Sequence, residues 1–317
     1  MRPSVVYVHG NGNKVRRDLL KSQWDTALFG RDMGEASRMA YWAPVRYPAP
    51  LPDHRPDPLD GGPEPAKDSP AGRQERAAAA VPPAEEFVAR TLAEARQEAG
   101  DTGLEGRAGP DEDALADWLR DMTYLADTLA HTESAPDPGP ADALPLEVVP
   151  LPRPGRTALF RRLVEHAFKD VHAYFFGGAG PAMRAVVQEA LDGPDGGPLV
   201  VVGHSLGTII AYEVLRERAR EVALLVTVGS PLAITEIQDR LARPPAVPDG
   251  VTAWRNASDL RDLVALDHTL RPEYAPQDRV TDVLVTNDSR NHHDIGAYLS
   301  QHPVREPVLR IFGDGPG

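Results

Sequence analysis

The feature that most constrains the fold is an apolar run, residues 199–202, that leads directly into Gly203-His204-Ser205-Leu206-Gly207. A run with no alternating polar residues is typical of a strand buried on both faces of a sheet. Residues 208–218 then have the composition of a good helix. Glycines two positions before and after Ser205 allow the strand and the helix to approach closely. We therefore predict a sharp strand-to-helix turn with Ser205 at its tip.

The rest of the chain alternates between short apolar runs and helical patterns. Residues 5–8 are a valine-rich run, a turn at 9–13 follows, and 15–29 have helical spacing. This order is typical of units that build a parallel sheet. Further strands are predicted at 39–42, 223–228, 251–256 and 282–286, and further helices at 159–176 and 294–300. The fold class we expect is α/β, a mostly parallel sheet of about six strands with helices on both faces.

A segment rich in Pro, Gly, Asp and Glu, residues 48–157, interrupts this pattern. Its first part, 48–71, has few residues that can pack in a core, and we expect a loop or disorder there. Two helical patterns follow, at 82–98 and 111–129, and the second has apolar residues on one face. We predict a core domain formed by 1–47 and 158–317, and an insertion at 48–157 that forms a helical cap or lid.

Charge and composition exclude several kinds of partner and site. The chain has 317 residues and a formal net charge of −13, which disfavours phosphate-rich nucleic acid as a partner. It contains no cysteine, so disulfides, thiolate metal sites and cysteine nucleophiles are excluded. No stretch approaches the ~20 apolar residues of a membrane span, and the N-terminal apolar run is too short for a secretory signal. We expect a cytoplasmic protein without stable membrane insertion.

A serine at the tip of such a turn suits nucleophilic chemistry. The turn lifts the Ser205 hydroxyl above the sheet edge, and the amides that begin the next helix favour a developing negative charge. Acyl transfer requires a second donor, which in sites of this kind comes from the loop after an early strand. The segment His9-Gly10-Asn11-Gly12-Asn13 occupies that place. We expect the main-chain N–H groups of Asn11 and Leu206 to form an oxyanion hole.

With this His-Gly loop and the Gly-His-Ser-Leu-Gly turn, the sequence resembles the α/β-hydrolase superfamily, in particular its lipase- and esterase-like members. The resemblance extends over 4–47 and 158–300. It implies a serine hydrolase with a Ser-Asp-His triad and without a cofactor. The first strand is already the His-Gly strand, so the two leading antiparallel strands of larger members are expected to be absent.

The order of triad residues in this superfamily is Ser, then Asp or Glu, then His, which limits the choice of base. The base belongs on the loop after the last predicted strand, and that loop holds His292 and His293. The resemblance favours His293, because members of the superfamily often place their histidine just before such a helix and His293 lies closer to 294–300. His292 stays an alternative. Two adjacent histidines rarely bind one metal ion without distant ligands, so we expect no metal site.

The acid belongs after the strand before the last, where it orients the imidazole and stabilises its charged form. The segment 254–264 resembles lipase-like members in which the aspartate two positions before a valine serves. This selects Asp262. Asp259 is then a structural residue of the turn, and Asp259 and Asp267 stay alternatives.

Together these residues predict cleavage of a carboxylic ester through an acyl-enzyme on Ser205. We expect a small acyl substrate with an apolar or aromatic group. Apolar wall is offered by the helix around Trp118 and Met122, by helix 160–176, and by Trp24, Trp42 and Tyr298. A thioesterase, acyltransferase, lactonase or peptidase would use the same residues, because specificity lies in the cap. A catalytically silent hydrolase-fold binding protein is the alternative from another class.

Overall fold

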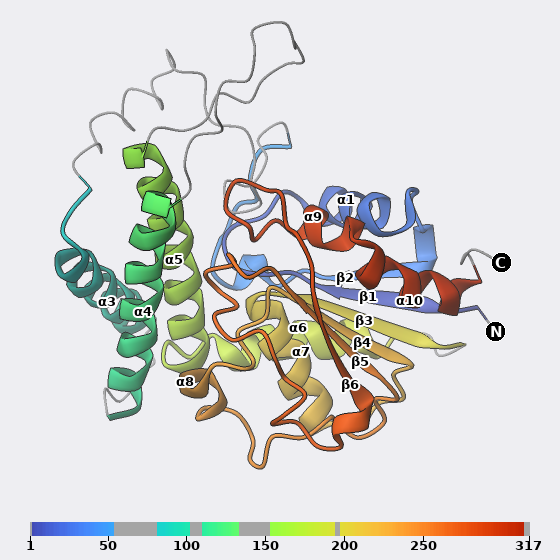
Figure 1. The fold of residues 1–317 in the computed structure, drawn as a ribbon. Coiled ribbons are helices and arrows are strands. Elements are labelled where there is room, and N and C mark those ends of the chain that lie inside the picture. The colour runs from blue at the N-terminus through green and yellow to red at the C-terminus, as the bar shows by residue number, and fades with distance from the viewer. Residues whose placement is uncertain (1, 54–80, 102–109, 133–152, 194–196, 314–317) are drawn as a thin grey trace, which may run out of the picture.

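One six-stranded sheet forms the centre of the molecule (Figure 1). The computed structural model describes residues 2–53, 81–101, 110–132, 153–193 and 197–313. The strands are all parallel, in the order β2-β1-β3-β4-β5-β6, so the predicted parallel α/β sheet is confirmed. Their bounds are β1 Ser4–Val8, β2 Ser37–Ala40, β3 Leu199–His204, β4 Leu224–Val228, β5 Trp254–Ser258 and β6 Val280–Leu284.

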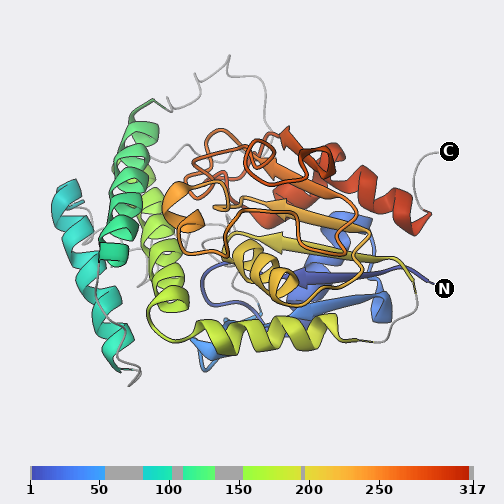
Figure 2. The ribbon, with the colours of Figure 1, turned by 90° about the horizontal axis from the view of Figure 1, so that it is seen from below.

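Helices cover both faces of this sheet, as predicted (Figure 1, Figure 2). Helices α1 (Arg17–Phe29), α9 (Ile295–Ser300) and α10 (His302–Phe312) lie on one face, and α6 (Gly180–Leu191) and α7 (Leu206–Glu217) lie on the other. Successive side chains of a strand point to opposite faces. Val5 and Tyr7 therefore join one apolar core, and Val6 and Val8 join the other.

The strand order reverses between β1 and β3, which positions the site. The chain passes from β1 outward to β2, and then returns to build β3 on the other side of β1. In open α/β sheets, the loops that leave the carboxyl ends of such neighbouring strands diverge and leave a crevice for ligands. Here those loops are 9–13 after β1 and the turn at Ser205 after β3.

Three long helices form a bundle at the carboxyl ends of the strands, beside the sheet (Figure 1, Figure 2). They are α3 (Ala84–Asp101), α4 (Pro110–Thr132) and α5 (Arg153–Phe175), and α5 also packs against α6 and α7. The predicted boundary between 157 and 158 falls inside α5. The division into core and cap stays a prediction, and most of the predicted loop at 48–71 lies outside the described residues.

Several predicted boundaries shift by two or three residues. The second strand is 37–40 rather than 39–42, because the Trp42 N–H leaves the sheet and donates to Nε2 of His9 (3.1 Å). β5 and β6 are 254–258 and 280–284 rather than 251–256 and 282–286, and the two pair residue for residue over these ranges. The prediction that 294–300 is the last helix was wrong, since α10 follows it. Also not predicted were α6, α8 (Thr235–Gln238) and the 3-10 helices η1 (Gly34–Ala36), η2 (Ala43–Val45) and η4 (Gln277–Arg279).

Among the described helices, none combines the length and the hydrophobicity that a membrane crossing requires.

Candidate active site

Ser205 occupies a strained turn between β3 and α7. Its backbone angles are φ 52° and ψ −129°, and a non-glycine residue held in such a region costs about 1–3 kcal/mol. The flanking glycines are required by close contacts. A Cβ on Gly207 would lie 2.2 Å from the carbonyl oxygen of Val8, and one on Gly203 would lie 3.0 Å from Cα of Thr208. The chain therefore has the predicted sharp turn, with the serine at its tip.

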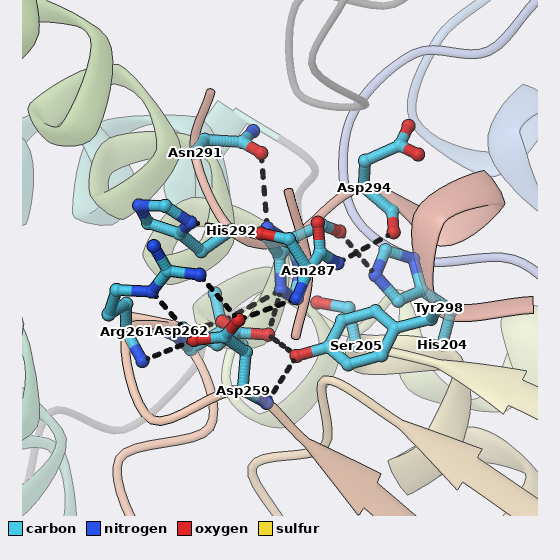
Figure 3. A network of polar contacts seen from close by, with 12 residues as sticks. His204, Ser205, Asp259, Arg261, Asp262, Asn287, Asn291, His292, Asp294 and Tyr298 are labelled. Carbon is cyan, nitrogen blue, oxygen red and sulfur yellow. Dashed lines mark hydrogen bonds and ion pairs between the residues drawn. The ribbon is translucent and has the colours of Figure 1, made fainter. Parts of the chain in front are cut away.

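His293 and Asp262 form a buried pair. Nδ1 of His293 lies 2.8 Å from each carboxylate oxygen of Asp262. Two further donors hold the carboxylate. The Tyr298 hydroxyl donates to Oδ2 at 2.6 Å (Figure 3), and the Val264 N–H donates to Oδ1 at 2.9 Å. Since the carboxylate accepts from Nδ1, the proton of a neutral imidazole is on Nδ1, and Nε2 has a free lone pair.

This pair meets the serine turn at the end of β4. The N–H of Ser205 donates to the carbonyl oxygen of Val228 (3.2 Å). The next residue, Gly229, has a φ of 53°, and a Cβ on it would lie 2.9 Å from both Asp262 Oδ2 and His293 Nδ1. Ser205 thus contacts Val228, and the imidazole of His293 lies against the next residue, Gly229.

The serine hydroxyl and the imidazole are not hydrogen-bonded to each other. Oγ of Ser205 accepts from the side-chain amide Nδ2 of Asn11 at 2.8 Å. Nε2 of His293 is buried without a hydrogen-bond partner, and so is Oδ1 of Asn11. Ser205, His293 and Asn11 have exposed fractions of 0%, 2% and 4%. The structure thus has a closed site in which the serine is bonded to asparagine rather than to histidine.

The two main-chain amides predicted for an oxyanion hole, those of Asn11 and Leu206, lie on two different segments, the loop after β1 and the start of α7. Leu206 is the first residue of α7, so its N–H has no acceptor inside that helix. Asn11 lies on the loop after β1, and its side chain rather than its main chain makes the hydrogen bond to Ser205. This hydrogen bond from Nδ2 of Asn11 to Ser205 was not predicted from the sequence.

His9 holds the other side of this loop. Its Nε2 accepts from the N–H groups of Trp42 and Ala43, both at 3.1 Å, while Nδ1 lies 2.9 Å from the carbonyl oxygen of Gly10 and donates to it. The ring stacks on Trp42 with centroids 4.4 Å apart. Burial, assisted by the charge of Lys14, lowers the pKa of His9 to about 3. His9 therefore stays neutral and serves as a fixed acceptor.

The alternative histidine has a different partner. Nδ1 of His292 donates to the carbonyl oxygen of Asn287 (3.0 Å), and the ring lies 6.2 Å from the ring of Phe160 on α5. It has a positive φ of 56°. The structure therefore brings His293, and not His292, to Asp262.

The alternative aspartates have structural partners. Oxygens of Asp259 accept from the side chain of Arg261 (3.0 and 3.1 Å) and from the N–H of Asn287 (2.6 Å) (Figure 3). Burial opposes the charged form, but these hydrogen bonds outweigh it and lower the pKa of Asp259. Asp267 closes a turn by accepting from the N–H of Thr269 (3.1 Å). Neither carboxylate contacts an imidazole within the described part of the chain.

Other supporting residues were not predicted in these roles. Nε2 of His204 donates to the carbonyl oxygen of His293 (2.9 Å), and the two rings lie 4.4 Å apart. Burial, and then the neighbouring His293, keeps the pKa of His204 well below its ordinary value. Tyr298, predicted as apolar wall, instead donates to Asp262. Oδ1 of Asn291 accepts from the N–H of His293 (3.1 Å). The loop sequence carries no signal for these partners, because each depends on the folded geometry.

The other aromatic residues predicted to line a pocket pack in the interior. Trp118 lies 6.4 Å from Phe168 between α4 and α5, and Met122 is equally buried in the same core. Trp24 packs 5.3 Å from Tyr7, on the α1 side of the sheet. These residues stabilise the bundle and the sheet.

Comparisons with known proteins give no relative: no family model, no curated protein and no solved structure matches this chain. In the ranges that the structure describes, no group of three or more His, Asp or Glu side chains could hold a metal ion. The geometry of Ser205, His293 and Asp262 therefore carries the functional argument.

Proposed function

We propose that the protein is a serine hydrolase of the α/β-hydrolase type, which cleaves a carboxylic ester through an acyl-enzyme on Ser205. The observation that carries the proposal is the His293–Asp262 pair. The carboxylate of Asp262 holds Nδ1 of His293, and Nε2 of His293 is buried and unpaired beside the strained serine turn. An imidazole oriented by a carboxylate, with a free nitrogen near a serine, is the arrangement of a general base.

The proposed reaction has two steps. Nε2 of His293 accepts the hydroxyl proton while Oγ of Ser205 attacks the acyl carbon, and the charged imidazole is stabilised by Asp262. The N–H groups of Asn11 and Leu206 donate to the oxyanion. His293 returns the proton to the leaving alcohol as the acyl–oxygen bond breaks. Water then attacks the acyl-enzyme by the same proton transfers and releases the acid.

The fold and the order of residues along the chain both support this assignment. Ser205 follows β3, and residues 9–13, the proposed donor loop, follow β1. These two strands lie on the two sides of the strand-order reversal, where α/β sheets bind ligands. The order Ser205, Asp262, His293 along the chain agrees with the superfamily. Asp262 and His293 follow β5 and β6, so all three residues come from the carboxyl ends of strands.

The face of α5 toward the site supports an apolar acyl group. Phe160 on this helix contacts the ring of His292, and Val164, Ala167 and Val171 follow Phe160 at helical spacing on the same face. All four are buried and none is charged. An uncharged acyl chain loses less hydration free energy than a charged one on entering such surroundings.

The test is covalent labelling of the intact protein by a fluorophosphonate, in which Oγ attacks phosphorus and fluoride leaves. We expect one adduct per chain, mapped to Ser205 by mass spectrometry. Ser205→Ala, which keeps Cβ and the turn, is expected to give none. Ser258→Ala, another fully buried serine whose hydroxyl has no partner, is expected to label as the wild type does.

Absence of an adduct in folded wild-type protein, or an adduct at another residue, would contradict the proposal. Wild-type protein would then be assayed on p-nitrophenyl esters of increasing acyl length, on thioesters and on amides. We expect the highest kcat/KM on an ester with an apolar acyl group. A clear preference for thioesters or amides would keep Ser205 and change the substrate class.

The side chain of Asn11 is expected to contribute to the oxyanion hole. Its Nδ2 lies 2.8 Å from Ser205 Oγ, so it is within reach of an oxyanion formed on a carbon bonded to that oxygen. Asn11→Ala keeps the main-chain N–H, and we expect it to lower kcat by about 10²- to 10³-fold, as loss of one donor does. Steady-state kinetics on the best ester measures this.

The matched control is Asn13→Ala, on the same loop. The half-buried side chain of Asn13 donates to the carbonyl oxygen of Ala49 and accepts from the N–H of Lys14. We expect its loss to change kcat less than about threefold. Equal effects of the two variants would show that the loop, and not the Asn11 amide, matters.

A further inference from the structure

A buried carboxylate on α5 holds the loop after β1. Asp170 is fully buried, and its Oδ2 accepts from the N–H of Gly12 at 2.6 Å. Its Oδ1 accepts from Nη1 of Arg46 (2.6 Å) and from the hydroxyl of Tyr47 (2.8 Å). Hydrogen bonds to a charged acceptor are stronger than neutral ones. This contact therefore fixes the loop strongly to a helix 158 positions away in the sequence.

The same network continues into the bundle. Arg46 donates to the carbonyl oxygen of Lys169 (2.8 Å) and contacts the carboxylate of Glu98 on α3. Buried charge is tolerated when it is paired and fully hydrogen-bonded. Asp170 meets both conditions, so its position is set by α5 together with Arg46.

Helix α5 reaches both sides of the site. In the first half of the helix, Phe160 lies against the ring of His292, which adjoins the proposed base. Ten positions later, Asp170 contacts Gly12 of the loop after β1. At 1.5 Å rise per residue these positions are about 15 Å apart along the helix axis. One rigid element thus spans the distance between the two loops.

We propose that Asp170 is a positioning residue that sets the oxyanion hole from the bundle; this rests on the proposed esterase function. Its bond to Gly12 uses the Gly12 N–H, which leaves the N–H of Asn11 as the donor of this loop for an oxyanion. It also fixes the peptide after Asn11, and with it the direction of the Asn11 side chain toward Ser205. A misplacement of a donor by about 1 Å is enough to lower a rate by about 100-fold.

The test is Asp170→Asn, which preserves size and removes charge. An asparagine has one acceptor, and the charge of Arg46 attracts it, so the NH2 group then faces the N–H of Gly12. Two donors in opposition displace the loop. We expect kcat on the best ester to fall about 10- to 100-fold with KM changed less than about threefold.

The matched control is Asp25→Asn. Asp25 is also fully buried and accepts from several donors: the Tyr7 hydroxyl (2.8 Å), the Met33 N–H (3.1 Å), Lys21 (2.8 Å) and the Ser37 hydroxyl (2.7 Å). It lies on α1, away from the donor loop. We expect both variants to lower Tm, and only Asp170→Asn to lower kcat.

An unchanged kcat in folded Asp170→Asn would overturn the proposal, and so would a rise in KM alone. If this variant does not fold, Arg46→Gln takes its place: it keeps Asp170 but loosens it, and we expect a fall in kcat of about 3- to 10-fold. An unchanged kcat in Arg46→Gln would then overturn the proposal. Measurements on the wild type distinguish failure of the Asp170 proposal from failure of the proposed function. Absence of both ester hydrolysis and Ser205 labelling in the wild type would contradict the proposed function itself.

Discussion

Replacement of His293 by asparagine is expected to lower kcat for ester hydrolysis by about 10⁶-fold, as loss of the base does in serine hydrolases. Asparagine preserves a donor toward Asp262 but has no atom in place of Nε2. Without Nε2, no group accepts the proton of Ser205, because Asn11 is the partner of the hydroxyl and itself donates to it. Steady-state kinetics with a chromogenic ester, together with the thermal unfolding midpoint, measures the change.

The neighbouring histidine is the control, with the same substitution. His292→Asn suits the positive φ of this residue, since asparagine tolerates that region. Its side-chain amide also preserves a donor for the carbonyl oxygen of Asn287. We expect His292→Asn to retain kcat within about tenfold. If His292→Asn were the inactive variant and His293→Asn the active one, the assignment of the base would be reversed.

Asp262→Asn is expected to lower kcat by about 10⁴-fold while the fold is retained. Each oxygen of Asp262 accepts from His293 and from one further donor, the Tyr298 hydroxyl at Oδ2 and the Val264 N–H at Oδ1. Burial and the charge of Asp262 raise the pKa of Tyr298, which therefore stays protonated as a donor. Whichever oxygen is replaced by NH2 consequently faces donors.

The imidazole of His293 can avoid placing its Nδ1–H against the new NH2 group only by moving its proton to Nε2. In that tautomer Nε2 cannot accept the proton of Ser205. Kinetics across pH 6 to 10 would measure the loss, which we expect throughout that range because the wrong tautomer is present at each pH. Asp259→Asn is the control: it breaks bonds to Arg261 and Asn287, so we expect a lower Tm and a fall in kcat under about tenfold. Equal losses in both variants would leave the acid unassigned.

The sheet was predictable from the sequence wherever its strands are apolar throughout. β3 is buried at all six positions, and its run of leucine and valine has no competing interpretation. β6 is an edge strand in which two polar residues, Thr281 and Asp282, interrupt the apolar pattern near its start, so its start was predicted too late. Helix α10 was missed because Pro307 lies inside it and disfavours a helix by propensity, whereas Val304 and Val308 stabilise it by packing.

The candidate site was predictable as far as chain order and turn chemistry extend. Turn chemistry selected Ser205, whereas the resemblance to lipase- and esterase-like members selected Asp262 and favoured His293. The structure brings Asp262 and His293 into direct contact. The partners that surround them were not predictable. Asp170 and Gly12, or His204 and the carbonyl oxygen of His293, share no local pattern, and only the packed bundle and the sheet bring them together. The bond of Ser205 to the Asn11 side chain depends on rotamers, which sequence spacing does not determine.

The Ser205 hydroxyl is completely buried, so access of an acyl donor to it and the reaction that follows are separate events. An acyl donor can react only with the fraction of molecules in which the path to Oγ is open, so its apparent Kd equals the intrinsic Kd divided by that fraction. Oγ of Ser205 is bonded to Asn11, and Nε2 of His293 has no partner. The proposed nucleophile and base therefore also have to form a hydrogen bond with each other after opening. A larger open fraction would therefore lower the apparent Kd, whereas the chemistry on the bound donor would stay unchanged.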